Sequence, residues 1–196
     1  MQGAGPVAGV TIVLAVLAAA SGPAGGSAYP VEAVLDDARS ACAVALNGEA
    51  VDNELASAGW AVAEPIAGSW LAEELAEKWD SVGTSHRQFV KDSGGRQLYV
   101  IFGMDRDTRF TQSICTVREP KAVLRSDGAR IVQWAGRAPV APAFAMPDLK
   151  GLDDVGFRKL WNPGLNDNSD ETQINYAKGF GLTYYAVRIE EGTEVQ

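Results

Sequence analysis

Apolar residues recur every three or four positions in several stretches of the chain, which predicts amphipathic helices. In the clearest stretch, 31–47, Leu35, Ala38 and Cys42 fall on one face, and most charged residues fall elsewhere. The Asn47-Gly48 pair that follows is a common helix end. Similar patterns predict further helices at 51–58, at 70–80 after a Ser69 N-cap, and within 121–135, strongest at 127–135.

Alternating or continuous apolar runs predict strands in two later regions. The first region contains strands at 87–92, 97–103 and 110–118, and the second has strands at 157–161, 173–176 and 182–190. Between the regions, the proline-rich stretch 138–149 predicts an extended connector. Helices mixed with hairpins predict an α+β fold of two layers, a mostly antiparallel sheet with helices packed on one face.

Two of the predicted hairpins share a short sequence similarity. The segment GRQLYVI, from Gly95, aligns with GLTYYAV, from Gly181, and this alignment pairs Tyr99 with Tyr185. A duplicated helix-hairpin unit would produce this pattern. So would the ordinary similarity of any two tyrosine-bearing hairpins, and both interpretations remain open at this point.

The first 28 residues contain no charged side chain. An apolar run of eleven residues at 10–20 precedes small residues that include Gly26 and Ala28, which suits a secretory signal peptide. The run is shorter than the roughly 20 residues that a spanning helix needs. We therefore expect a signal peptide at 1–28 and a single α+β domain at 29–196, periplasmic or secreted and without a membrane anchor after cleavage. A retained N-terminal anchor is the alternative.

The composition argues against several classes of function. With 17 Lys+Arg against 25 Asp+Glu, the net charge of −8 disfavours a nucleic-acid partner. One histidine and two cysteines are too few for a His/Cys zinc site. Neither of the common glycine-rich phosphate-binding motifs occurs. We therefore expect no cofactor.

The two cysteines gain significance once export is expected. In an oxidising compartment, Cys42 and Cys115 form the one available intramolecular disulfide. Cys42 lies on the apolar face of the first predicted helix, and Cys115 lies on a predicted strand. A disulfide is the favoured interpretation, with two buried thiols as its alternative.

His86 is the only histidine, so any histidine-based catalysis must use it. Its neighbours Ser85 and Asp80 suggest a catalytic triad. Adjacent side chains diverge along a strand, however, and no G-x-S-x-G elbow presents a nucleophile. We interpret His86 as a surface histidine near a helix–strand junction.

Acidic residues offer a second kind of candidate chemistry. Two pairs, Asp105 with Asp107 and Asp153 with Asp154, could supply carboxylates for acid–base catalysis, but both have the character of turns. The string 166–171 (NDNSDE) places oxygen ligands as a calcium site does, but it lacks the glycine at position six and the glutamate at position twelve of a calcium loop. Turns and a solvated loop are favoured. The alternative is a hydrolase-type enzyme that uses these carboxylates, with a metal bound at the Asp167–Glu171 loop.

Five tryptophans could include stacking platforms for sugars, although most tryptophans pack in a core. They are Trp60, Trp70, Trp79, Trp134 and Trp161.

The order of short motifs resembles that of small exported proteins of alphaproteobacteria, which form uncharacterised families. It comprises a Cys-bearing first helix, Ala58–Trp60 (AGW), a hairpin leading to Ile114–Val117 (ICTV), and a helix, and it covers about 33–136. The resemblance implies a Cys42–Cys115 pairing and an exported location. It implies no activity and no catalytic residues.

The sequence therefore favours a non-catalytic exported module that binds a protein or a small-molecule ligand. The carboxylate-dependent enzyme remains the alternative, and the oligomeric state stays open.

Overall fold

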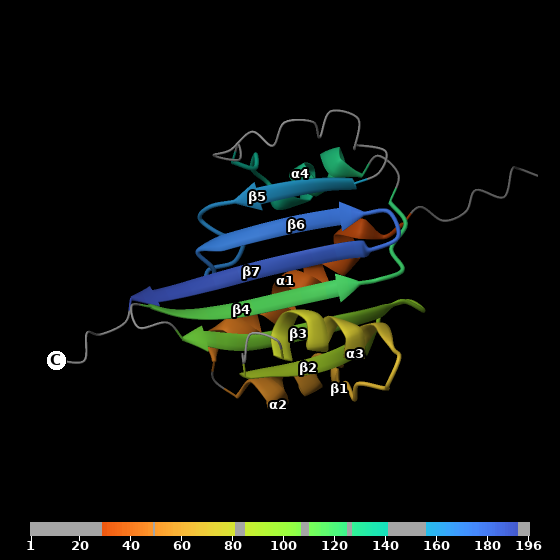
Figure 1. Ribbon diagram of the computed structural model, residues 1–196. Helices are drawn as coiled ribbons and strands as arrows, with labels where there is room; N and C mark the ends of the chain where they lie inside the picture. The colour runs from red at the N-terminus through yellow and green to blue at the C-terminus, as the bar shows by residue number, and fades with distance from the viewer. Residues whose placement is uncertain are drawn as a thin grey trace, which may run out of the picture.

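A seven-stranded antiparallel sheet forms the centre of the computed structural model (Figure 1). The structure describes residues 29–48, 50–80, 85–106, 110–124, 127–140 and 156–191. The strand order is β1-β2-β3-β4-β7-β6-β5, and every neighbouring pair is antiparallel. The strands are β1 (Ala61–Val62), β2 (Ser85–Asp92), β3 (Gln97–Arg106), β4 (Phe110–Glu119), β5 (Gly156–Trp161), β6 (Glu171–Ala177) and β7 (Gly181–Glu191).

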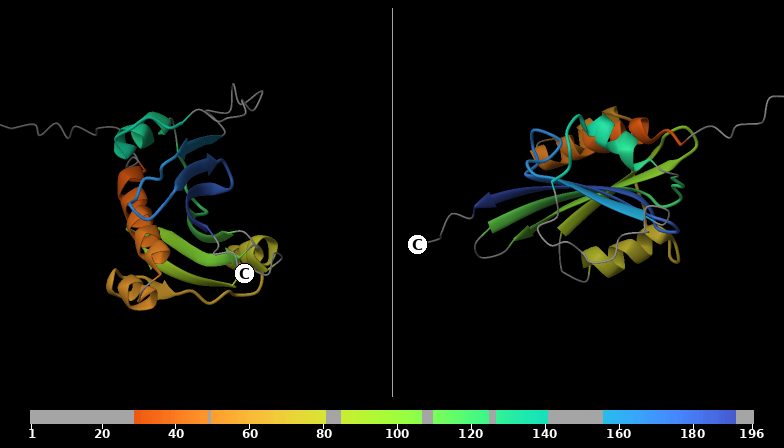
Figure 2. Two further views of the ribbon diagram at one scale, coloured as in Figure 1. Left: turned by 90° about the vertical axis from the view of Figure 1, so that its left-hand side faces the viewer. Right: turned by 90° about the horizontal axis from the view of Figure 1, so that it is seen from above.

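The helices of the described residues are divided between the two faces of the sheet. They are α1 (Val31–Asn47), α2 (Val51–Ser57), α3 (Trp70–Glu74), which continues as the π-helix η1 (Leu75–Trp79), and α4 (Gly128–Ala135). Figure 2 shows α1, α2 and α4 on one face and α3–η1 on the other. The predicted α+β class, with a helix layer on one face of an antiparallel sheet, is confirmed. The helix predicted at 70–80 is present as α3–η1, but it lies on the opposite face of the sheet, which the sequence pattern did not indicate.

Helix α1 provides most of the helical side of the main core. Its buried residues follow the predicted period and include Leu35, Ala38 and Cys42. They pack with strand residues such as Val100 and Val117, which point to the same face of the sheet. The helix ends at Gly48, whose φ of 79° is a left-handed conformation that glycine adopts without steric cost.

A smaller core lies on the opposite face. Leu71, Leu75 and Trp79, spaced four residues apart along α3–η1, are buried with Ile101 of β3. Val100 and Ile101 are neighbours on β3 but belong to different cores, because successive side chains of a strand point to opposite faces. The Ser69 hydroxyl caps α3 by accepting a hydrogen bond of 3.3 Å from the Ala72 amide, as predicted.

The disulfide between Cys42 and Cys115 is confirmed, and it links α1 to β4. Each cysteine is fully buried, so the bond lies inside the main core between the helix layer and a central strand.

Among the described residues, a helix followed by three strands occurs twice, as α3–η1 with β2–β4 and as α4 with β5–β7. The third strands of the two sets, β4 and β7, pair at the centre of the sheet. Tyr99 lies on β3, the second strand of its set, whereas Tyr185 lies on β7, the third. The aligned segments therefore hold different positions in the two sets, and duplication of the unit stays a prediction.

Several sequence predictions fall outside the described residues. These include the signal peptide at 1–28, most of the connector 138–149, and Asp107, Asp153 and Asp154. Within the part of the chain that the structure describes, no helix is long and apolar enough to cross a membrane.

Candidate ligand-binding site

The face of the sheet that α1 does not cover carries two rows of polar side chains. Strand register places Arg118 of β4 beside Thr183 of β7, Thr183 beside Asn175 of β6, and Asn175 beside Arg158 of β5. Neighbouring strands lie about 4.8 Å apart, so the row runs across the sheet in regular steps. A second row, made of Thr116, Tyr185 and Gln173, lies next to it.

These rows form the floor of a cavity of about 690 Å³. The sheet curls so that this face is concave, and α3–η1 stands at one side of it (Figure 2). Glu74, Lys78 and Trp79 line that side, and Phe180 of the β6–β7 turn also lines the cavity. The volume lies within the usual range for small-molecule sites.

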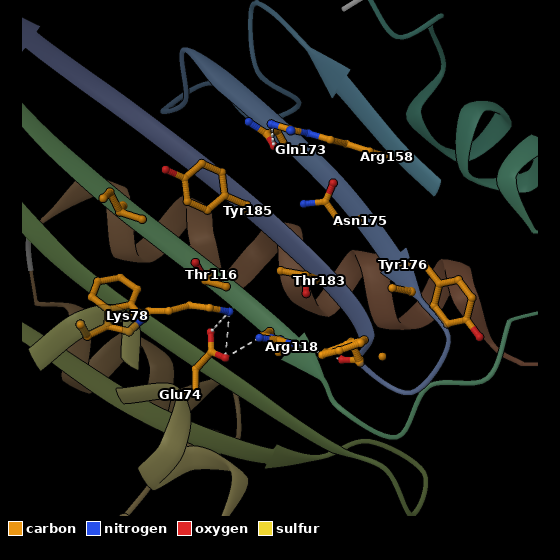
Figure 3. Close-up of a pocket in the computed structure, with 15 residues that line it drawn as sticks. Glu74, Lys78, Thr116, Arg118, Arg158, Gln173, Asn175, Tyr176, Thr183 and Tyr185 are labelled. Atoms are coloured by element: carbon orange, nitrogen blue, oxygen red, sulfur yellow. Dashed lines mark hydrogen bonds and ion pairs between the residues drawn. The ribbon is translucent and has the colours of Figure 1, made fainter. Parts of the chain in front are cut away.

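Arg118 and Glu74 form a buried ion pair at the base of the cavity (Figure 3). Their side chains are 8% and 7% exposed, and Lys78 adds a second cation that contacts both oxygens of Glu74, at 3.0 and 3.1 Å. The Arg118 guanidinium also donates to the Phe180 carbonyl oxygen at 3.0 Å and lies 5.0 Å from the Trp70 ring centroid. The guanidinium is therefore held in place without a ligand.

Some polar groups around the cavity lack a partner within the described part of the chain. The buried Nε of Arg118 and the buried Oδ1 of Asn175 make no hydrogen bond. A buried polar group without a partner lowers stability and is uncommon in folded proteins, so these two atoms mark unused hydrogen-bonding capacity beside the cavity. The side chains of Thr116 and Thr183 offer further hydrogen-bonding groups at the same surface.

A chain of hydrogen bonds crosses the other end of the cavity floor. Arg158 donates to the Gln173 Oε1, and the Gln173 amide donates to the Glu171 carboxylate, each at 2.6 Å. Tyr185 lies on the neighbouring strand. Burial, and then the negative charge of Glu171, raise the pKa of the Tyr185 phenol, so the hydroxyl stays a neutral donor at ordinary pH.

His86 is not part of this cavity. Its Nε2 lies 3.6 Å from the Asp80 carboxylate, its ring centroid is 5.8 Å from that of Trp79, and its side chain is 15% exposed. It lies at the predicted helix–strand junction but is more buried than a surface residue. Ser85 is exposed at the start of β2.

Side chains of the acidic string 166–171 accept hydrogen bonds from their own loop and from neighbouring strands. Asn166 accepts from the Asn168 amide, Asp170 accepts from the Ile189 amide, and Glu171 accepts from Gln173. Among the described residues, no group of three or more His, Cys, Asp or Glu side chains is arranged to hold a metal. The side chain of Asp105 is not described, so its pairing with Asp107 lies outside this test.

The tryptophans divide between core and surface contacts. Trp60, Trp79 and Trp161 are buried. Trp70 lies over Arg118 and beside Tyr99, and Trp134 donates to Asp36 at 2.8 Å. Trp79 is the one that lines the cavity described above.

Apart from Trp79, the cavity residues were not singled out from the sequence as ligand contacts. Gln173 and Asn175 alternate with the buried Ile174 and Tyr176 along β6, and this alternation was the available signal. It indicates a polar face on that strand. It does not show that Arg118, more than 50 residues earlier, lies in the same row, because that depends on the pairing of β4 with β7.

Comparisons with protein-family models, with curated proteins and with solved structures found no match to this chain.

Proposed function

We propose that this protein is an exported, non-catalytic module that binds a small molecule in the cavity on the concave face of its sheet. The observation that supports the proposal is the row of Arg118, Thr183, Asn175 and Arg158 along the cavity floor. Small-ligand sites are concave and combine apolar surface with polar groups at fixed positions. This cavity has both, with apolar residues such as Ile114 beside the polar rows, although its lining is more polar than that of most such sites.

The proposal of binding without catalysis follows from the kinds of side chain in the cavity. Glu74 is the one carboxylate among its described lining residues, and it is engaged by two cations. Acid–base hydrolysis by two carboxylates needs a second such group at the reacting bond. The lining is instead rich in donors and acceptors suited to holding a ligand.

Export is proposed from two independent features. The segment 1–28 has the pattern of a signal peptide, and the mature domain contains a disulfide. We expect the periplasm or the medium as the location. Intact-mass spectrometry of exported protein should give a chain that begins at Tyr29 and is two hydrogens lighter than the dithiol form. An intact Met1 would contradict the proposal of export.

The binding proposal can be tested by a fragment screen on the exported protein. We expect some compounds to shift the backbone amide resonances of Arg118, Asn175 and Thr183 saturably in two-dimensional NMR spectra. Substitution of Asn175 by Leu should weaken those hits, because it removes the unpartnered acceptor from the floor. A diverse library that yields no hit in the cavity, or hits only elsewhere, would refute the proposed function.

A further inference from the structure

We infer that the ligand is an organic anion whose acid group binds Arg118 in exchange with Glu74. This inference rests on the proposed function, because it names the chemical class of the molecule that the same cavity would hold.

Positively charged side chains outnumber negatively charged ones around the cavity. Lys78, Arg118 and Arg158 line it together with one carboxylate, that of Glu74. Glu171 lies beside the floor and is linked to Arg158 through Gln173. The three charges that touch one another, Lys78, Arg118 and Glu74, sum to +1, whereas the whole chain has a net charge of −8. A local positive charge in an acidic protein favours an anion at this position.

The arrangement at Arg118 shows how an acid group would be accommodated. A guanidinium matches a carboxylate in geometry. Glu74 contacts Arg118 through one pair of atoms, the Nη1 of Arg118 and the Oε2 of Glu74. If a ligand carboxylate takes that place, Glu74 keeps Lys78 as its partner, at 3.0 Å in the present structure. The exchange leaves two ion pairs, so every charge of the cluster is then paired.

The position of Glu74 suits such an exchange. It lies at the end of α3, where the backbone passes into the π-helix η1, and this segment packs on the sheet through the smaller of the two cores. Short π-helical segments occur often at functional sites. Lys78, on the same segment, has a side chain that is 51% exposed and therefore has space to follow Glu74.

The rest of the cavity indicates more than a simple inorganic ion. Trp79, Ile114 and Phe180 provide apolar surface. Thr183, next to Arg118, and Asn175, one strand further along the row, provide neutral polar groups. A volume of about 690 Å³ accommodates an acid group with an apolar body of several carbon atoms.

Matched pairs of acids and amides test the inference directly. We would titrate the exported protein with benzoate and hexanoate, and in parallel with benzamide and hexanamide, and follow the cavity resonances by NMR. We expect the acids to bind at least tenfold more tightly than their amides. Equal binding of acids and amides in the cavity would overturn the inference and leave the proposed function intact.

Absence of cavity shifts with both acids, while other fragments bind there, would also overturn it. Absence of cavity binding by any compound would instead refute the proposed function.

Three variants separate the roles of the charged residues. Glu74→Gln removes the competing carboxylate and should raise the affinity for benzoate at least threefold. Lys78→Gln removes the alternative partner of Glu74 and should lower the affinity for benzoate severalfold. Because the Lys78 side chain is exposed, we expect this variant to fold. Arg118→Gln should abolish acid binding. If Arg118→Gln does not fold, the opposite effects of the other two variants still decide the question.

Asp52→Asn is the matched control for Glu74→Gln. Asp52 pairs with Arg87, and both side chains are 58% exposed, outside the cavity. This variant also removes one carboxylate from an arginine but should leave benzoate binding unchanged. Tighter binding in Asp52→Asn, equal to that in Glu74→Gln, would show a general charge effect and would contradict the exchange at Arg118.

Discussion

Cys42 of α1 and Cys115 of β4 are joined by a disulfide across which their Cα atoms lie 5.4 Å apart. The two residues are 73 positions apart in the chain, and both are fully buried. Because β4 pairs with both β3 and β7, the bond attaches the helix layer to the centre of the sheet. It therefore holds together the two layers that form the main core.

Removal of this disulfide should destabilise the fold. The double variant Cys42→Ala, Cys115→Ala is expected to lower the free energy of unfolding by about 2–5 kcal/mol, because the unfolded chain gains the conformational freedom that the crosslink removes. Urea denaturation followed by circular dichroism measures the change. Reduction of the wild-type protein provides the control and should give a similar loss. An unchanged denaturation midpoint in both experiments would show that the bond does not stabilise the fold.

Gly103 of β3 should not tolerate a larger residue. A Cβ atom at this position would overlap the Ser85 carbonyl oxygen and would lie 2.9 Å from the Trp79 ring. Gly103→Ala is therefore expected to lower the free energy of unfolding by about 1–3 kcal/mol, the usual range for overpacking. It should also displace Trp79 from the sheet, which a change in tryptophan fluorescence would report.

Gly128→Ala is the matched control for that substitution. A Cβ at Gly128, in the first turn of α4, would meet only the flexible Lys159 side chain, at 3.4 Å. Alanine is a better helix former than glycine, so this variant should be as stable as the wild type or slightly more stable. Equal effects of the two substitutions would contradict the close packing of Trp79 on Gly103.

Stability at high pH should depend on Tyr29. Its hydroxyl donates to the Glu119 carboxylate, and Arg96 lies over its ring and pairs with the same carboxylate. Burial raises the pKa of the Tyr29 phenol far above its ordinary value, and the hydrogen bond to Glu119 raises it further. The unfolded chain releases this proton near pH 10, whereas the folded protein retains it. Stability is therefore retained below about pH 10 and falls as the pH rises further.

Tyr29→Phe should remove this part of the pH dependence. Near pH 8 the variant is expected to be less stable by about 1.5–3 kcal/mol, because it loses a hydrogen bond to a charged group. Above pH 10 its stability should fall less steeply, by up to about 1.4 kcal/mol per pH unit. Urea denaturation between pH 8 and 11.5 measures both effects. Tyr99→Phe, which removes a hydroxyl bonded to Gln97 at the surface, is the control. Parallel curves for wild type and Tyr29→Phe would refute the prediction.

Local patterns allowed most of the elements to be predicted. The first helix was predicted at 31–47 and is observed there, because its apolar period and the Asn47-Gly48 end are local signals. The strand predicted at 110–118 extends by one residue in β4, and the strand at 173–176 by three residues in β6. The stretch after Trp60 forms a strand of only two residues, which lies at the edge of the sheet and pairs with β2 alone.

The cavity could not be predicted in the same way, because it depends on long-range register. Arg118 and Arg158 stand in one row because β4, β7, β6 and β5 pair in that order, and no local pattern encodes this order. The same holds for Glu74, which belongs to a helix whose sequence does not show which face of the sheet it covers. The disulfide could be predicted because a chain with two cysteines allows a single pairing.

Phe180 provides a test of the cavity that is independent of the buried charges. Its side chain is 70% exposed at the β6–β7 turn, lines the cavity, and makes no contribution to either core. Phe180 contacts Arg118 through its backbone carbonyl oxygen, and that oxygen remains in Phe180→Ala. The free energy of unfolding of this variant should therefore lie within about 0.5 kcal/mol of the wild-type value, as is usual for surface substitutions.

Ligand affinity should change where stability does not. Loss of an aromatic contact at the cavity should weaken binding of benzoate about two- to tenfold, since such contacts contribute about 0.5–1.5 kcal/mol. Isothermal titration calorimetry measures the affinity, and Ile66→Ala is the control, because Ile66 is 73% exposed before α3 and does not line the cavity. Equal affinities in the wild type and both variants would show that the ligand does not contact the β6–β7 turn. Weaker binding in Phe180→Ala alone would place the ligand between this turn and Arg118.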